Sequence, residues 1–118
     1  MAVEILITGP ARSDIEQIWW RGCEQYNRRV ADDYKRLIKQ AIQDLSEEPF
    51  KSGTLAVGAR NDGLRRYRLE HSRKKAGVSI RKPAHTIFYY AIEGKAIVIS
   101  RVIREARAFV ISEIEPPP

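Results

Sequence analysis

The sequence predicts an α+β protein in which two helices pack against one face of an antiparallel sheet. Three observations predict this class. Apolar residues recur every three or four positions over residues 11–45, the period changes to two from Leu64, and a Glu93-Gly94 turn separates two apolar runs. Two consecutive helices followed by three consecutive strands, rather than helices that alternate with strands, indicate two layers. At 118 residues we expect one domain, residues 1–118.

The N-terminal part predicts a strand followed by a helical hairpin. Residues 3–7 (VEILI) form the strand, and Pro10 suits the first turn of a helix. The apolar stripe of this helix is Ala11, Ile15, Ile18, Trp19, Gly22 and Tyr26. A second helix begins after Asn27 or Arg28 and ends at Pro49. Its stripe is Val30, Tyr34, Leu37, Ile38, Ala41 and Leu45. The short gap between the stripes indicates an antiparallel pair.

The rest of the chain predicts three antiparallel strands, giving the order β-α-α-β-β-β. Residues 50–63 hold three glycines and little periodicity, so we expect a connection with at most one short turn. The alternating stretch from Leu64 is the first strand, followed by a basic loop (SRKKAGVSIRKP) and by the hairpin HTIFYYAI and AIVISRVI. We expect the N-terminal strand to add along an edge of this sheet. The tail REARAFVISEIE predicts a short helix or an edge strand.

The positive charge of the chain is concentrated in one segment. The formal net charge is +6, yet residues 60–82 carry nine Lys/Arg against two acids, and the remainder is close to neutral. Such a footprint is typical of a protein that binds nucleic acid or an acidic protein partner. The alternative is a solvated basic hairpin that only improves solubility.

Several classes of protein and site are not expected. Apolar runs such as Ala96–Ile99 are far shorter than the roughly 20 residues of a membrane span. Glu4 interrupts the apolar N-terminus, so we expect no signal peptide. A lone Cys23 offers no disulfide framework, which fits a reducing cytoplasm. His71 and His85 stand without a ligand cluster, so we expect neither a metal nor a cofactor.

Four segments together resemble the ParE/RelE toxin superfamily of bacterial type II toxin–antitoxin systems. They are an A-x-x-D-I-x-x-I-W pattern at residues 11–19, then LRRYRLEHSR, PAHTIFYYAI and AIVISRVIRE. The chain is most similar to the ParE branch, in which R-R-Y/H-x-L-x-H-S, P-x-H-x-I-x-Y and I-x-R-I/V-L-H-E stretches recur in this order. The resemblance extends from Ala11 to Glu105.

The resemblance implies a cytoplasmic toxin that arrests growth and is silenced by a cognate antitoxin, as in plasmid or chromosome stabilisation. ParE-like members poison DNA gyrase, whereas RelE-like members cut messenger RNA on the ribosome. A third reading is an inactive module that only binds an antitoxin. Since the fold does not decide among them, the residues must.

The chain matches the RelE nuclease pattern only in part. The resemblance places Arg66 and Arg68 on the strand basic pair and Arg104 on the C-terminal arginine of the nucleases. Thr86 stands where the middle-strand arginine belongs, and Val110 stands where the tyrosine belongs. Arg104 also replaces the histidine of the ParE ending. Arginine has a pKa too high for a general base. We therefore expect no catalytic residue, and a toxin that acts by binding.

We expect the cationic side chains to form one binding surface. Its predicted members are Arg65, Arg66, Arg68, Arg73, Lys74, Lys75, Arg101 and Arg104. Trp20 lies off the stripe of the first helix, where it either makes a protein contact or covers the back of the sheet. The expected partners are the antitoxin and DNA gyrase, with at most weak direct contact to nucleic acid and no contact to a membrane.

Overall fold

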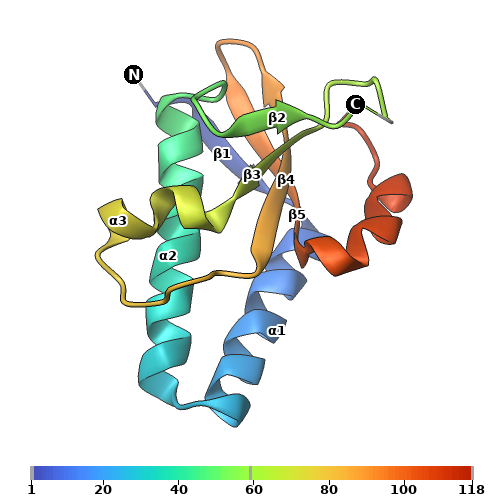
Figure 1. Cartoon of the computed structure of the whole chain (residues 1–118). Coiled ribbons are helices and arrows are strands. Elements are labelled where there is room, and N and C mark those ends of the chain that lie inside the picture. The colour runs from blue at the N-terminus through green and yellow to red at the C-terminus, as the bar shows by residue number, and fades with distance from the viewer. Residues whose placement is uncertain (1, 59, 118) are drawn as a thin grey trace.

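The computed structural model describes residues 2–58 and 60–117, with only the backbone described at residues 106, 108 and 109. Five strands form one mixed sheet in the order β1-β5-β4-β3-β2 (Figure 1). The strands are β1 (Glu4–Ile7), β2 (Thr54–Ala56), β3 (Arg65–Arg68), β4 (His85–Ile92) and β5 (Ala96–Arg104). The helices are α1 (Gly9–Gln25), α2 (Arg28–Glu47) and α3 (Arg73–Ala76), with 3₁₀ segments η1 (Leu69–Ser72) and η2 (Glu105–Glu113). The α+β class is thereby confirmed.

The predicted helical hairpin is present, and polar side chains fix both starts. The Thr8 hydroxyl accepts a hydrogen bond from the backbone N–H of Ala11 at 3.2 Å, and the Asn27 side chain accepts one from Val30 at 2.9 Å. Each cap satisfies a backbone donor that the first turn leaves unpaired. The two helices project together past the ends of β4 and β5 (Figure 1).

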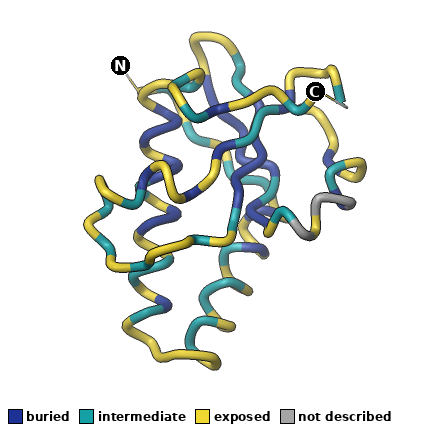
Figure 2. The backbone as a smooth tube through the Cα atoms, in the orientation of Figure 1, coloured by how far each residue is buried: buried dark blue, intermediate teal, exposed yellow. Residues whose placement is uncertain are grey.

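Both faces of the sheet are covered in part, which the two-layer prediction did not include. The main core lies between the sheet and α2, on Leu37, Leu45, Tyr67, Ile87 and Ile97 among others. A second core forms where η2 packs on the opposite face, and its buried members are Leu64, Phe88, Tyr90, Val98, Ile103, Val110 and Ile114. Figure 2 shows the buried backbone concentrated in β4, β5 and α2. The C-terminal tail is therefore a helical element, one of its two predicted forms.

The three predicted antiparallel strands are present as β3, β4 and β5, but the sheet has five strands and differs from the prediction in two details. β1 joins the edge as expected but runs parallel to β5, and β2 pairs with β3 inside the segment predicted as a connection. β2 escaped prediction because it is three residues long, and two of the three are exposed. An alternating pattern of apolar and polar residues can be recognised only over a run longer than three residues.

The basic strand that begins after Leu64 is shorter than its alternating pattern indicated. It ends at Arg68, and η1 and α3 follow within the segment predicted as loop. A buried network explains the departure. The Tyr67 hydroxyl donates to Ser72 at 2.8 Å, and Ser72 donates to the carboxylate of Asp44 on α2 at 2.6 Å. Ser72 must turn inward to make both bonds, so the chain leaves the sheet.

A β-bulge in β5 determines where the end of this strand points. The register with β4 shifts between Phe88 and Tyr89, which leaves Ser100 without a direct partner. Ile97 and Ile99 face the helices before the bulge, and Val102 faces them after it. A bulge inserts one residue and so exchanges the two faces of a strand.

Among the described residues, no helix is both long and apolar enough to cross a membrane.

Candidate functional site

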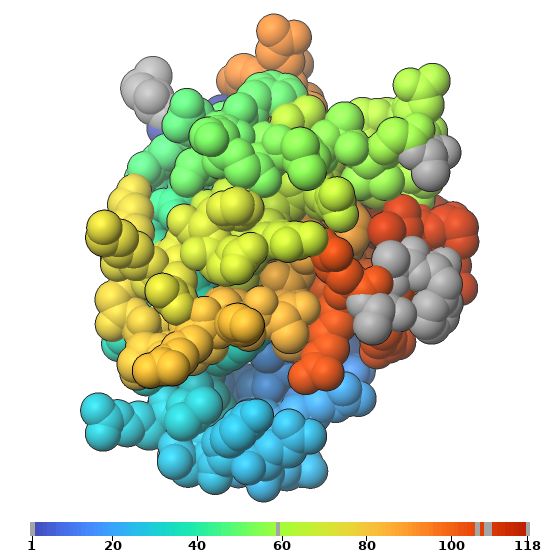
Figure 3. Space-filling model, viewed as in Figure 1, coloured from blue at the N-terminus to red at the C-terminus, as the bar shows by residue number. Residues whose placement is uncertain are grey.

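The predicted cationic surface is divided between the two faces of the sheet. Residues of the charged segment 60–82 spread across the middle of the view in Figure 3, from α3 to the edge of η2. Within β3, Arg66 and Arg68 lie opposite Phe88 and Thr86, on the face that η2 covers. Arg104 lies instead on the helix face, two positions beyond Val102.

Arg66 and Arg68 share one carboxylate. Arg68 donates to the two carboxylate oxygens of Glu105 at 3.0 and 3.3 Å, and Arg66 donates to the same group at 3.4 Å. Thr86 donates to it as well, also at 3.4 Å. The side chains of Arg66 and Arg68 keep 37% and 53% of their exposure, so both remain accessible to a partner. Arg68 also forms an ion pair with Glu70 at 3.7 Å, so the two guanidinium groups face two carboxylates.

Arg65 and Arg101 contribute to the structure rather than to an open surface. Arg65 donates to the Thr54 hydroxyl at 2.8 Å, and its guanidinium lies 4.9 Å from the ring centre of Phe50. Arg101 makes two hydrogen bonds to Asp14 on α1, at 2.7 and 2.8 Å, and only 19% of its side chain is exposed. The same carboxylate accepts from the backbone N–H of Val102 at 3.0 Å and so holds the strand beyond the bulge.

The basic cluster Arg73–Lys75 lies on α3, at the side of the molecule. Arg73 donates to the backbone carbonyl of Arg81 at 2.6 Å and thereby braces the loop that leads to β4. Lys75 forms an ion pair with Asp44 at 3.1 Å, and Lys74 is exposed.

The carboxylate of Asp44 stays ionised although it is buried. Burial alone would raise the pKa of Asp44, but hydrogen bonds from Ser72, Gln40 and Lys75 outweigh the effect of burial and lower this pKa below its ordinary value.

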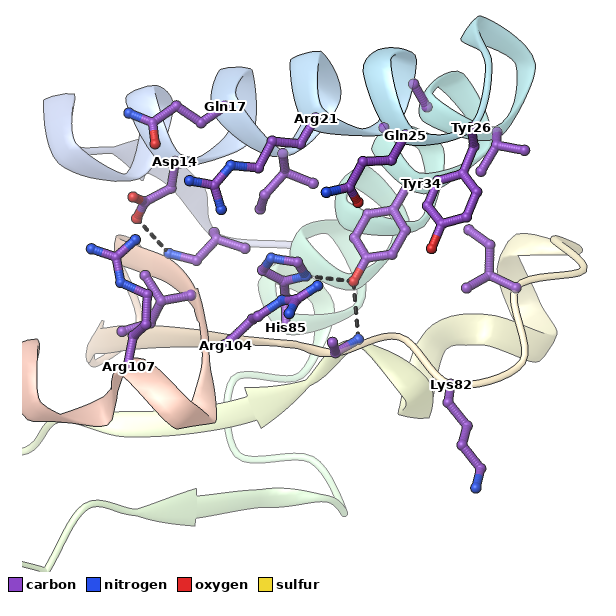
Figure 4. A pocket seen from close by; sticks show the side chains of 18 residues that line it. Asp14, Gln17, Arg21, Gln25, Tyr26, Tyr34, Lys82, His85, Arg104 and Arg107 are labelled. Atoms are coloured by element: carbon purple, nitrogen blue, oxygen red, sulfur yellow. Dashed lines mark hydrogen bonds between the residues drawn. The ribbon is translucent and has the colours of Figure 1, made fainter.

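Arg104 lines a pocket of about 420 Å³ between the free end of the helical hairpin and the ends of β4 and β5 (Figure 4). Arg21 reaches into it from α1, and Arg107 borders it from η2. The ammonium of Lys82 points away from the pocket, while its chain lines the rim. The remaining polar lining is Asp14, Gln17, Gln25, Tyr26, Tyr34 and His85.

His85 is held as a neutral imidazole at the floor of this pocket. The Tyr34 hydroxyl lies 2.6 Å from its Nδ1 and accepts a hydrogen bond from the backbone N–H of Ala84 at 3.1 Å. We assign the hydroxyl as donor to Nδ1, which leaves the proton of His85 on Nε2. Burial is the main cause that lowers the pKa of His85 to about 4, and the positive charge of Arg104 is the second. Burial raises the pKa of Tyr34 to about 12, so the hydroxyl stays protonated.

The sequence did not single out Arg21, Tyr34 or Arg107 as site residues. A signal for the first was present, because Asp14, Ile18, Arg21 and Gln25 follow one another at helical spacing and share a face of α1. Nothing in the sequence marks the pocket itself, since it depends on how far the helices extend past the sheet. Among the described residues, no group of three or more His, Cys, Asp or Glu side chains could hold a metal ion.

Trp20 is 60% exposed on α1 and does not cover the sheet. Its ring packs edge-on against Trp19 at 5.0 Å between centres, and the Trp19 indole donates to Asp32 on α2 at 2.8 Å. An exposed indole is typical of a protein contact, and this role of Trp20 stays a prediction.

The chain is similar in fold to a solved chain of a toxin–antitoxin system, and in sequence to a family of toxins from such systems. One solved structure with a similar fold is titled "Chromosomal ParDE TA system from P. aeruginosa". The superposition covers 87% of the present chain and 96% of the chain in that structure, with a TM-score of 0.64 and 15% sequence identity. A likeness at this identity establishes the fold. A search of curated proteins finds no matching relative. The family described as "ParE toxin of type II toxin-antitoxin system, parDE" matches residues 5–109, and the chain belongs to this family.

Proposed function

We propose that this chain is a cytoplasmic toxin that inhibits DNA gyrase, and that a cognate antitoxin neutralises it. Membership of the ParE toxin family supports the toxin role. The observation that favours binding over chemistry is the separation of the cations, with Arg66 and Arg68 on one face of the sheet and Arg104 on the other. A gyrase poison needs a complementary charged surface and no proton transfer of its own.

The same separation disfavours a RelE-like nuclease. Cleavage of RNA would need a base, an acid and cations gathered around one phosphate. Here Arg104 cannot join Arg66 and Arg68, Thr86 is bonded to Glu105, and Val110 is buried in the second core. Arginine stays protonated at all physiological pH values and cannot take the role of base. We assign gyrase contact to the exposed pair Arg66 and Arg68.

We assign the antitoxin to the edge of the sheet at β2. Phe50 and Leu55 are 61% and 55% exposed beside this edge strand, next to the cations of β3. An acidic, amphipathic segment would pair with the free strand edge and cover both apolar side chains. Coupled folding of such a segment buries on the order of 1,000–3,000 Å².

Expression of the chain without an antitoxin tests the proposal. We expect growth arrest together with induction of the DNA-damage response, because a poisoned gyrase leaves broken DNA. Arrested translation with cut messages would instead support the nuclease. Normal growth of cells that contain folded protein would support the inert, antitoxin-binding reading.

A further inference from the structure

The pocket that contains Arg104 carries a surplus of positive charge. Arg21, Arg104 and Arg107 line it from three separate elements, α1, β5 and η2. The acid beside them is Asp14, and its oxygens are already bonded to Arg101 and to the backbone of Val102. The pocket therefore offers guanidinium groups without a free internal carboxylate of its own to satisfy them.

Neutral donors and an apolar floor complete the pocket. The Nε2–H of His85 is free of the Tyr34 contact, which uses Nδ1, so it can donate to a ligand. Ile18, Val30 and Val102 supply apolar surface below the charged groups. Tyr26 stands at the rim with 71% of its surface exposed, so its ring face is open to a planar group. A volume of about 420 Å³ suits a small molecule or one unit of a polymer.

We propose that this pocket binds a nucleotide unit, with its phosphate between Arg21, Arg104 and Arg107 and its base against Tyr26. Guanidinium groups form paired hydrogen bonds with phosphate oxygens, and a phosphate offers enough oxygens for several of them. One peptide carboxylate would satisfy a single guanidinium and leave the others unmatched. An exposed aromatic ring beside a cationic cleft is the arrangement that stacks a nucleic-acid base.

This site is distinct from the gyrase surface assigned to Arg66 and Arg68, because it lies on the opposite face of the sheet. The ligand could be a free nucleotide or one nucleotide of a DNA or RNA strand, since both present the same phosphate and base. The proposal does not depend on gyrase inhibition, and either can fail alone.

Fluorescence anisotropy with a short single-stranded DNA oligonucleotide, phosphorylated at its 5′ end and labelled at its 3′ end, tests the proposal. The purified chain should bind at about 100 mM salt, and R21Q/R104Q should weaken binding by about tenfold or more. The control K35Q/K39Q removes the same charge from exposed positions of α2 outside the pocket, and it should change affinity by about twofold or less. Tyr26→Ala should weaken binding without any change of charge.

Competition with unlabelled deoxyadenosine monophosphate distinguishes a free nucleotide from a nucleotide within a strand as the ligand. Displacement assigns the site to a free nucleotide, and displacement only by unlabelled oligonucleotide assigns it to a strand. Equal losses in R21Q/R104Q and K35Q/K39Q would overturn the proposal, because binding would then follow net charge alone. Binding of an acidic peptide that depends on Arg21 and Arg104, with no binding of the oligonucleotide, would overturn it as well. Thermal melts of every variant establish that each is folded, and Tyr26→Ala, at an exposed position, provides a test should R21Q/R104Q not fold.

Discussion

Asp14 is the residue on which the end of β5 most depends. Its carboxylate binds the guanidinium of Arg101 and the N–H of Val102, and all three groups are largely buried. Removing one member of such a set leaves the others without partners in a site with little water. The cost therefore exceeds the value of any single hydrogen bond.

We expect Asp14→Ala to lower the free energy of unfolding by about 3–5 kcal/mol, measured by urea denaturation. The double variant D14A/R101M should lose less than D14A alone, since it removes the unpaired guanidinium as well. A loss below about 0.5 kcal/mol in D14A, the range of ordinary surface substitutions, would contradict this role.

We expect His85 to make the stability of the fold sensitive to mild acid. Its pKa is about 4 in the folded protein against an ordinary 6.5, and the groups that face it are Tyr34, Arg104, Arg21 and Asp14. Between these two values the unfolded chain binds a proton that the folded chain excludes. Stability is therefore lost as the pH falls from 6.5 to about 4.

The expected loss from His85 is about 3 kcal/mol over this window, seen as a fall in the urea midpoint. His85→Gln should flatten that part of the profile, whereas His71→Gln, at the exposed second histidine, should leave it steep. An H85Q profile as steep as that of the unmodified chain would show that other groups cause the acid sensitivity.

At the scale of elements, the packing of α1 on α2 depends on Gly22. A Cβ atom at this position would lie 3.1 Å from the Cβ and 3.2 Å from the Cα of Ala31. The helices approach here because both residues are small. A larger side chain would separate the helices and alter the pocket beside them, which Gly22 and Ala31 also line.

We expect Gly22→Leu to destabilise the protein by about 1–3 kcal/mol, since overpacking displaces backbone that cannot yield. Thermal denaturation measures the change, and Glu24→Leu, an exposed position on the same helix, serves as control. Equal melting temperatures of G22L and the unmodified chain would mean that the helices are free to move apart.

Elements with strong local signals could be predicted from the sequence, and those that depend on distant contacts could not. Both long helices have periodic stripes, and Asn27 and Pro10 mark their starts. β2 has no such pattern and exists because β3 offers it an edge. The bulge in β5 is stabilised by Thr8 and Asp14, about ninety positions away in sequence. Its effect on Arg104 could not be predicted, and so the division of the cations was missed.

At the scale of the whole molecule, fewer cationic side chains are available to a partner than the positive charge of segment 60–82 suggests. Arg60 donates to the backbone carbonyls of Ile111 and Ile114 and so holds η2 on the sheet. Arg65 and Lys75 are also engaged within the protein. Arg66 and Arg68 stay partly exposed on the face that η2 covers, although both pair with carboxylates. The pocket of Arg104 lies on the opposite face, and Lys74 lies on α3, which packs against α2. A protein with two separate cationic sites can contact two partners at once, which a single ridge cannot.

The most direct test of the account is a supercoiling assay with purified gyrase, run beside cleavage of a ribosome-bound message. We predict that the chain inhibits supercoiling, that R66Q/R68Q weakens the inhibition by about tenfold or more, and that K35Q/K39Q changes it by about twofold or less. The message should stay intact. Unchanged supercoiling together with a cut message would contradict the account, because the cations of β3 would then serve catalysis rather than docking.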